Sequence, residues 1–189
     1  VIGLQGEPNT PEFLGPDRVI ATAKHFLADG GTHYGDDQGD ARISEEELRD
    51  IHAPGYIGAR EAGVQTVMSS FSSWNGVKMH GNSYLLTDVL KDRMGLDGFI
   101  IGDWNGHGQV PGCTNATCPQ SVNAGLDMFM VVEDWKKLYR NTLEQVQNGE
   151  ISMERLDDAV SRVLRVKIRA NVFERGRPSE RAAALLDAF

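Results

Sequence analysis

The stretch Gly98-Phe99-Ile100-Ile101-Gly102-Asp103-Trp104 determines how the rest of this chain is interpreted. Its three successive apolar residues are typical of a strand buried on both faces, as in a parallel sheet. The strand ends in a carboxylate followed by an indole. Since ligands bind at the carboxyl ends of parallel strands, we predict that Asp103 is a catalytic group. Trp104 beside it offers a flat apolar face that suits a sugar ring.

The order of strand, loop and helix repeats along the chain. Further strands are expected at 19–26, 63–71 and 127–132, and helices at 44–62, 83–94, 120–124, 133–147 and 152–170. Ser44 and Glu47 form a capping box at the first long helix, and Ser152 caps the last one. Pro54 should kink or shorten the helix in which it lies. Four successive β/α units imply a parallel sheet with helices outside it.

Four β/α units are half of an eight-fold barrel, and half a barrel leaves two open strand edges. We therefore predict the α/β class and the second half of a (β/α)8 TIM-type barrel with parallel strands. Residues 1–175 would form this partial barrel domain, and residues 176–189 a linker and short helix toward a second domain. A small doubly wound parallel sheet is the alternative.

Composition argues against several classes of partner. The chain has 189 residues and a formal net charge of -8, whereas nucleic acids and anionic membrane surfaces bind basic patches. No apolar run approaches the roughly 18 residues that a membrane span needs. The chain begins with Val1 and shows no signal sequence, so we expect a piece cut from a longer protein.

Two local features leave alternatives open. Cys113 and Cys118 lie in one loop, where they form either a disulfide of an exported protein or two free thiols. A zinc site is disfavoured because no second Cys/His pair lies at ligand spacing. The loop acids Asp36, Asp37 and Asp40 are typical of a solvated surface, with calcium binding as the competing hypothesis.

Chemically useful side chains follow three of the expected strands. The first strand ends with Lys24 and His25, the second carries Met68, and the third leads to Asp103 and Trp104. Each has an ordinary structural interpretation, because strand-end acids often cap turns and Lys-His pairs often lie on the surface. Together they are what an enzyme built on a barrel needs, since its active face is formed by these strand ends.

Several motifs in order along the chain resemble glycoside hydrolase family 3, and most closely its β-glucosidases and exo-β-glucanases. The matching segments are Lys24-His25-Phe26 with Asp29-Gly30-Gly31-Thr32, the stretch 68–76, the stretch 98–104, Ala124-Gly125-Leu126-Asp127-Met128, and the stretches 156–160 and 162–167. They cover nearly the whole chain, and their combination is far more specific than any single motif.

The resemblance implies a retaining hydrolase that releases glucose from the non-reducing ends of β-glucans, cello-oligosaccharides or β-glucosides, without a cofactor. Asp103 matches the nucleophile, and Lys24 and His25 match residues that bind hydroxyls of the sugar. Trp104 matches an aromatic residue bordering that sugar, and Met68 is expected to contact it. Retention requires an ionised carboxylate and a protonated carboxyl about 5 Å apart. A nearby Lys24 would favour the ionised form of Asp103.

The second carboxyl group is not found among these motifs. In many of the similar enzymes it is a Glu on a domain after the barrel, whereas this chain ends at Phe189. We therefore expect the isolated chain to be nearly inactive and to depend on the missing halves of the same polypeptide. Glu133 is the alternative within the chain, although a Glu at a helix start is commonly a partner of the helix dipole.

Departures from the family pattern define the competing functions. The loop 27–33 lacks a Gly-His-Gly element and His33 is displaced, which disfavours a β-N-acetylglucosaminidase. Phe71 stands where many members have Tyr, so the hydrogen bonding near Asp103 should differ. A β-xylosidase on the same scaffold and a non-catalytic carbohydrate-binding fragment are the remaining alternatives. The resemblance also favours a periplasmic or secreted location.

Overall fold

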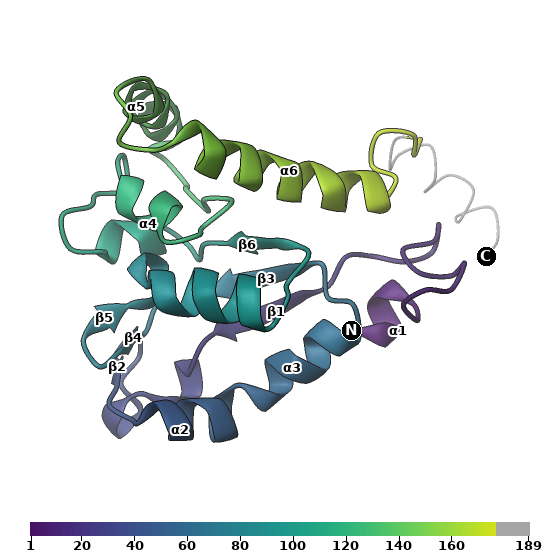
Figure 1. Ribbon diagram of the computed structural model, residues 1–189, viewed down its shortest axis with the longest axis horizontal. Coiled ribbons are helices and arrows are strands. Elements are labelled where there is room, and N and C mark those ends of the chain that lie inside the picture. The colour runs from purple at the N-terminus through teal and green to yellow at the C-terminus, as the bar shows by residue number, and fades with distance from the viewer. Residues whose placement is uncertain (177–189) are drawn as a thin grey trace.

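The computed structural model describes residues 1–176, which form an α/β fold around a parallel three-stranded sheet (Figure 1). The sheet has the order β1-β3-β6, with β1 at Thr22–Phe26, β3 at Thr66–Ser69 and β6 at Phe99–Ile101. All pairs are parallel, so the predicted parallel sheet is confirmed. The predicted short helix and most of the linker, at 177–189, lie outside the described residues.

The fourth strand, predicted at 127–132, is wrong as a regular strand. The segment does run beside β6, where Gly102 N–H donates to the Met128 carbonyl at 2.9 Å. The pairing is nevertheless a single parallel bridge between Ile101 and Met128. The carboxylate of Asp127 takes the N–H of Ile100 at 2.8 Å, so a side chain replaces the backbone partner at the start of this ladder.

A second small sheet was not predicted. It joins β2 (Asp40–Ala41), β4 (Ser73–Trp74) and β5 (Val77–Lys78), which come from the loops after β1 and β3. Asn75 and Gly76 connect β4 to β5 with φ values of 48° and 84°, as a tight hairpin turn requires. Strands of two residues carry too little alternation for a sequence pattern to predict them.

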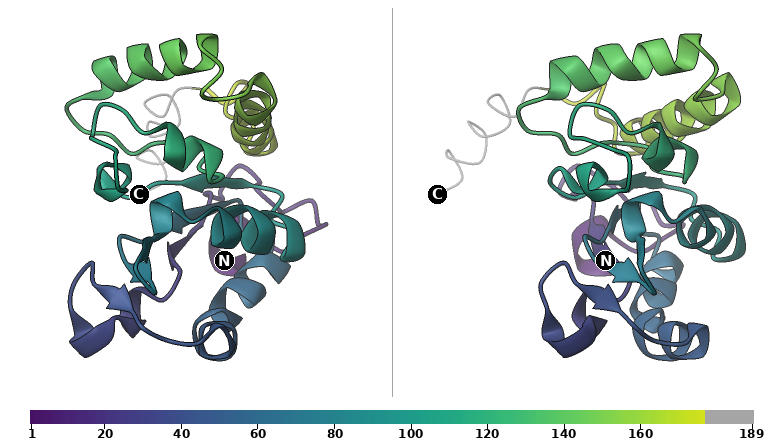
Figure 2. Two further views of the ribbon diagram at one scale, coloured as in Figure 1. Left: turned by 60° about the vertical axis from the view of Figure 1, so that its left-hand side comes forward. Right: turned by 90° about the vertical axis from the view of Figure 1, so that its left-hand side faces the viewer.

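Helical segments pack around the main sheet (Figures 1 and 2). The predicted 44–62 helix is divided by Pro54 into α2 (Glu45–Glu47), the π-helical segment η3 (Leu48–His52) and α3 (Pro54–Glu61). The capping box of Ser44 and Glu47 is confirmed. The remaining helical segments are α1 (Ile2–Gln5), the π-helical η5 (Tyr84–Arg93), α4 (Pro119–Asn123), α5 (Trp135–Gln147) and α6 (Met153–Arg169).

The core lies between the sheet and these helices. Phe26, Leu86 and Ile100 are fully buried in it, together with Leu126 from the segment beside β6. Burying such side chains is the main favourable term that fixes the sheet and therefore the strand ends. Among the helices of residues 1–176, none combines the length and the apolar character that crossing a bilayer would require.

Candidate active site

Side chains from two parallel strands meet at the carboxyl end of the main sheet. His25 lies near the end of β1, and Asp103 follows β6 by two residues. Nε2 of His25 is 3.5 Å from Oδ2 of Asp103, and Nδ1 of His25 is 3.0 Å from Oδ2 of Asp29. His25 therefore stands between two carboxylates, and the structure brings together the first and third predicted strand ends.

The conformation of Asp103 is fixed by hydrogen bonds to its backbone and its side chain. The N–H of Trp104 donates to its Oδ1 at 2.7 Å, and the N–H of Gly106 donates to its backbone carbonyl at 2.9 Å. Its own N–H donates to Nε2 of His80 at 2.9 Å. The side chain is 17% exposed, so one face of the carboxylate remains open to a ligand. Oδ2 is the oxygen with fewer backbone partners.

The other predicted site residues occupy different positions. Trp104 is 60% exposed beside the carboxylate, so its ring is free to border a ligand. Met68 is buried in β3, next to Ile101 of β6. Lys24 is exposed, and within residues 1–176 it forms no ion pair shorter than 4.0 Å. The partner that the described residues give Asp103 is thus His25 rather than Lys24.

Two residues at this site were missed by sequence reasoning. Asp29 lies four residues after His25, its Oδ2 is 3.0 Å from Nδ1 of His25, and this short separation was a local signal for the pair. His80 is 1% exposed and binds the backbone of Asp103 from a different loop. The separation of 23 residues leaves no sequence pattern that predicts this second contact.

Phe71 lies near the site without contributing a polar side-chain group. The Phe71 ring lies 6.0 Å from the His80 ring and offers no hydroxyl. The backbone carbonyl of Phe71 accepts a hydrogen bond from Lys78 at 2.9 Å. The side chains that make polar contacts with Asp103 include those of His80 and His25.

The loop after β6 is closed by a disulfide between Cys113 and Cys118, which resolves the alternative left open by the sequence. The same loop covers His107, a fully buried residue whose Nε2 is 2.9 Å from the Asn115 carbonyl. Burial lowers the pKa of His107, so this ring is neutral at pH 7. The disulfide therefore closes the loop that packs next to the Asp103 turn.

The acidic loop shows no arrangement suited to calcium. Oδ1 of Asp40 accepts the N–H of Gly76 at 2.8 Å, and Oδ2 lies 3.3 Å from Arg42. In the part of the chain that the structure describes, no group of three or more His, Cys, Asp or Glu side chains is placed to hold a metal ion. Asp40 therefore binds the turn between β4 and β5 in the small sheet.

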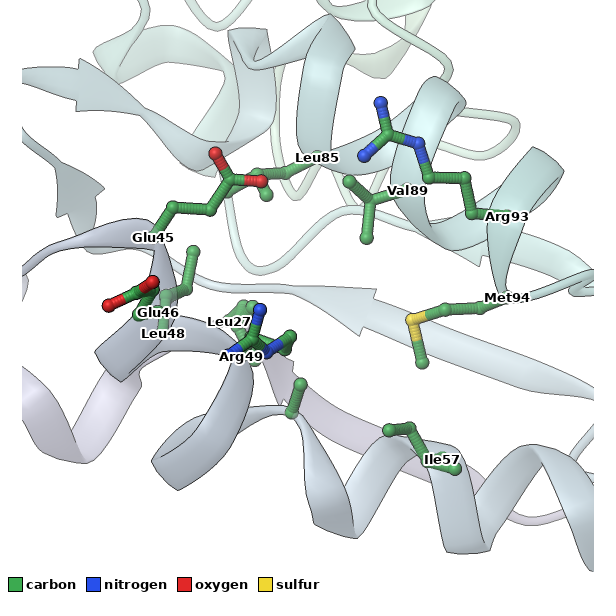
Figure 3. Close-up of a pocket in the computed structure, with 11 residues that line it drawn as sticks. Leu27, Glu45, Glu46, Leu48, Arg49, Ile57, Leu85, Val89, Arg93 and Met94 are labelled. Atoms are coloured by element: carbon green, nitrogen blue, oxygen red, sulfur yellow. The ribbon is translucent and has the colours of Figure 1, made fainter.

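An apolar pocket of about 410 Å³ is lined by none of the candidate site residues (Figure 3). It is formed between the segment 45–57 and η5, with Leu48, Ile57 and Val89 among its walls. Asp103, His25 and Trp104 do not line it. A gap between helices without a catalytic pair is a packing feature, and it does not compete with the strand-end site.

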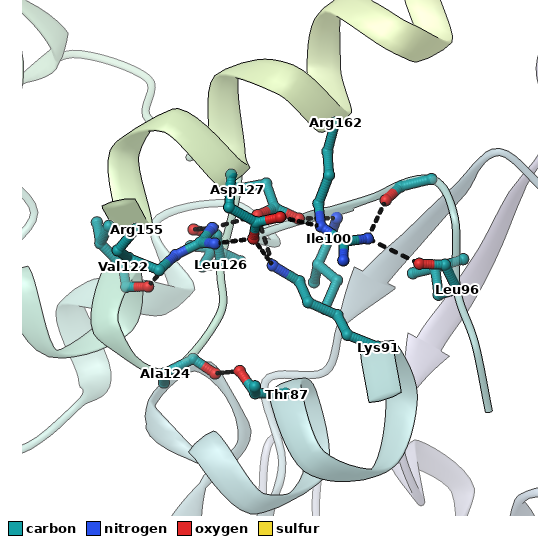
Figure 4. Close-up of polar contacts among 12 residues, drawn as sticks. Thr87, Lys91, Leu96, Ile100, Val122, Ala124, Leu126, Asp127, Arg155 and Arg162 are labelled. Atoms are coloured by element: carbon teal, nitrogen blue, oxygen red, sulfur yellow. Dashed lines mark hydrogen bonds and ion pairs between the residues drawn. The ribbon is translucent and has the colours of Figure 1, made fainter. Parts of the chain in front are cut away.

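A cluster of charged side chains connects η5, α6 and the segment beside β6 (Figure 4). Asp127 has a fully buried side chain and accepts from Lys91 at 2.7 Å and from Arg155 of α6. Asp158 also pairs with Lys91, at 3.2 Å, and with Arg155. Because Asp127 also holds the N–H of Ile100, this cluster anchors the strand three residues before Asp103.

Comparison with known proteins identifies what this arrangement resembles. The sequence profile of the glycosyl hydrolase family 3 N-terminal domain matches residues 1–166. A β-xylosidase of Formosa agariphila is 34% identical over 91% of this chain, and a β-glucosidase of Rhizobium radiobacter is 31% identical over 83%. The chain spans 25% and 18% of these two relatives, which are therefore several times longer.

Solved structures show the same likeness. An exo-1,3/1,4-β-glucanase from a Pseudoalteromonas species superposes with a TM-score of 0.92 and 50% sequence identity. The match covers 94% of this chain and 22% of that one. A Listeria innocua β-glucosidase solved with glucose matches with a TM-score of 0.76 and 29% identity, over 84% of this chain and 22% of that one.

Proposed function

The chain belongs to glycosyl hydrolase family 3, and we propose from this premise that it carries the nucleophile of a retaining β-glucosidase or exo-β-glucanase. The substrate is a β-glucan, a cello-oligosaccharide or a β-glucoside, which loses glucose from its non-reducing end. Support for this substrate class comes from the exo-glucanase and β-glucosidases that the chain resembles.

One observation carries the assignment of the nucleophile. The carboxylate of Asp103 is partly open at the carboxyl end of β6, with His25 3.5 Å away and the exposed ring of Trp104 beside it. A carboxylate among groups that hydrogen-bond hydroxyls and an aromatic surface suits the first sugar of a glucoside. We assign sugar contacts to Lys24, His25, Trp104 and Met68.

The reaction has two steps. An oxygen of Asp103 attacks the anomeric carbon while an acid/base group protonates the departing glycosidic oxygen, giving a covalent glycosyl-enzyme. The same group then deprotonates water, which displaces Asp103 and releases glucose with retained configuration. The hydrogen bond from Trp104 N–H to Oδ1 leaves Oδ2 as the attacking oxygen in this proposal.

The acid/base group comes from another part of the polypeptide. The chain spans 25% or less of the first relatives, so most of such an enzyme lies outside it. Residues 1–175 then form the second half of a (β/α)8 barrel, and 176–189 lead to the domain that supplies the acid/base. The isolated chain is accordingly inactive. Glu133 is exposed and remains the candidate within the chain.

A periplasmic or secreted location is part of the proposal. The Cys113–Cys118 disulfide fits an oxidising compartment, because such bonds are rare in reducing cytosols. A Salmonella typhimurium relative that is 30% identical over 82% of this chain is a periplasmic β-glucosidase.

The test is covalent trapping in the complete polypeptide. An activated fluoroglucoside should label the wild-type enzyme, and peptide mapping should find the sugar on Asp103. The Asp103→Asn variant should stay unlabelled, with Asp36→Asn in the solvated loop as a matched control that labels normally. A binding-only protein would remain unlabelled in every case, and a label on another carboxylate would contradict the assignment.

A second substrate is favoured by a specific observation, since the Formosa relative is a β-xylosidase. A xyloside lacks the hydroxymethyl group of a glucoside, and one such group changes specificity by roughly 10- to 200-fold. Comparing kcat/KM for aryl β-glucosides and β-xylosides decides between the two. A preference for the xyloside would replace glucose by xylose in the proposal and leave the role of Asp103 unchanged.

A further inference from the structure

His80 lies directly behind the turn that carries Asp103. It belongs to a short helical turn, Met79–Gly81, that follows β5, and its ring is 1% exposed. Nε2 accepts the backbone N–H of Asp103 at 2.9 Å. Nothing in the local sequence of β6 supplies this contact, so the position of Asp103 depends on a loop from elsewhere in the fold.

The hydrogen bonds define the state of the ring. Nε2 is an acceptor, so it carries no proton. A hydrogen bond with the backbone of Ser70 raises the pKa of the ring. Burial lowers the pKa of His80 to about 4, helped by His107 and Lys78 and opposed by Asp103. The ring is therefore neutral at pH 7.

The turn is shaped to fit this ring. A Cβ placed on Gly106 would come within 2.4 Å of Cε1 of His80, and one placed on Gly102 within 3.3 Å of its Nε2. Asn105, which lies between these glycines in the turn, has φ of 55°. Glycines on both sides of Asp103 let the backbone lie against the imidazole, so the contact is built by both partners.

We infer that His80 is a positioning residue for Asp103: its unprotonated Nε2 holds the Asp103 backbone N–H and so aims the carboxylate at the anomeric carbon. The inference rests on the proposed function, because it assumes that Asp103 is the nucleophile. Without this acceptor, a buried N–H loses its partner, and the 102–106 turn must shift to find another. A displacement of about 1 Å at a reacting group costs on the order of 10²-fold in rate.

Two amide substitutions separate positioning from simple packing. His80→Gln can place its amide oxygen near the position of Nε2 and keep the acceptor for Asp103. His80→Asn is one methylene shorter and cannot reach the Asp103 N–H, so it removes the acceptor. Both remove the aromatic ring, so a role in packing alone would lower the Tm of these variants without slowing the trapping reaction of the folded enzyme.

The experiment uses the complete polypeptide and measures the rate of trapping by an activated fluoroglucoside, together with glucose affinity. His80→Gln should trap within about tenfold of wild type, and His80→Asn should trap about 10²-fold more slowly with nearly unchanged glucose affinity. Gly106→Ala, which presses on the same ring, should resemble His80→Asn. Equal trapping rates for Gln and Asn would overturn the inference.

A second measurement keeps the inference testable if a variant does not fold. In ¹⁵N-histidine-labelled wild-type enzyme, the His80 ring should show the neutral Nδ1–H form at pH 7. A proton on Nε2 would overturn the inference whatever the kinetics. Failure of the proposed function is distinguishable, because the wild-type enzyme would then carry its label on a residue other than Asp103, or none.

Discussion

Replacing Asp127 with asparagine should destabilise the protein far more than the same change at an exposed ion pair. The Asp127 side chain is fully buried and accepts from Lys91, from Arg155 and from the N–H of Ile100. Lys91 is itself 3% exposed, and burial is the largest influence lowering its pKa, while the charge of Asp127 raises it. Asparagine keeps the shape of the side chain but removes its charge.

The size of the destabilisation follows from the groups that lose a partner when Asp127 is replaced. Among residues 1–176, the carboxylate that remains paired with Lys91 is that of Asp158, at 3.2 Å, and its side chain is 40% exposed. Lys91 donates to Oδ1 of Asp127 and the Ile100 N–H donates to Oδ2, so replacing either oxygen with an amide NH₂ leaves one of the two donors without its acceptor. Breaking a buried pair on one side costs about 3–5 kcal/mol. For a domain of this size, that corresponds to a fall in Tm of roughly 10 °C.

Thermal unfolding of the complete polypeptide, followed by circular dichroism, measures the effect. Asp97→Asn is the matched control, since Asp97 also pairs with arginines of α6, Arg165 and Arg169, but is 61% exposed. Exposed pairs contribute about 0–1 kcal/mol, so this variant should unfold close to wild type. Equal Tm values for Asp127→Asn and Asp97→Asn would refute the role given to the buried cluster.

Three further outcomes are expected. The free energy of unfolding should fall by roughly 3 kcal/mol in full as the pH decreases from 6.5 to about 4. In this range His80 takes up a proton in the unfolded chain but not in the folded chain. A urea midpoint whose pH dependence is the same in His80→Gln as in wild type would contradict this. Trp104→Ala should raise KM for glucosides by roughly threefold to tenfold, through loss of an aromatic surface that is 60% exposed; an unchanged KM would remove Trp104 from the site. The isolated chain should not hydrolyse an aryl β-glucoside, and Glu133→Gln should leave the complete enzyme near wild type; turnover by the chain alone, or loss of activity in that variant, would place the acid/base within it.

The parallel sheet could be predicted because its strands are apolar runs that differ from the amphipathic helices between them. The run before Asp103 is buried in β6, and Ser152 caps α6 as expected. Apolar runs and helix caps depend on residues close together in the sequence, so the sequence alone predicts them. It also placed His25 and Asp103 at the carboxyl ends of the two strands on either side of β3, and their side chains lie 3.5 Å apart.

What could not be predicted depends on contacts between distant segments. The side chain of Asp127 replaces a backbone partner of Ile100, which turns an apparent strand into a single bridge. His80 reaches Asp103 across 23 residues, and its fit depends on Gly106 lacking a Cβ. Such contacts follow from how loops pack at the sheet edge, and no periodicity in the sequence encodes them.

A crystal structure of the complete enzyme after reaction with a fluoroglucoside tests the central claim most directly. We expect a bond between a carboxylate oxygen of Asp103 and the anomeric carbon, with His25 and Lys24 against the sugar hydroxyls and Nε2 of His80 still accepting the Asp103 N–H. A sugar bound to a different carboxylate, or seated away from the carboxyl end of β6, would contradict it.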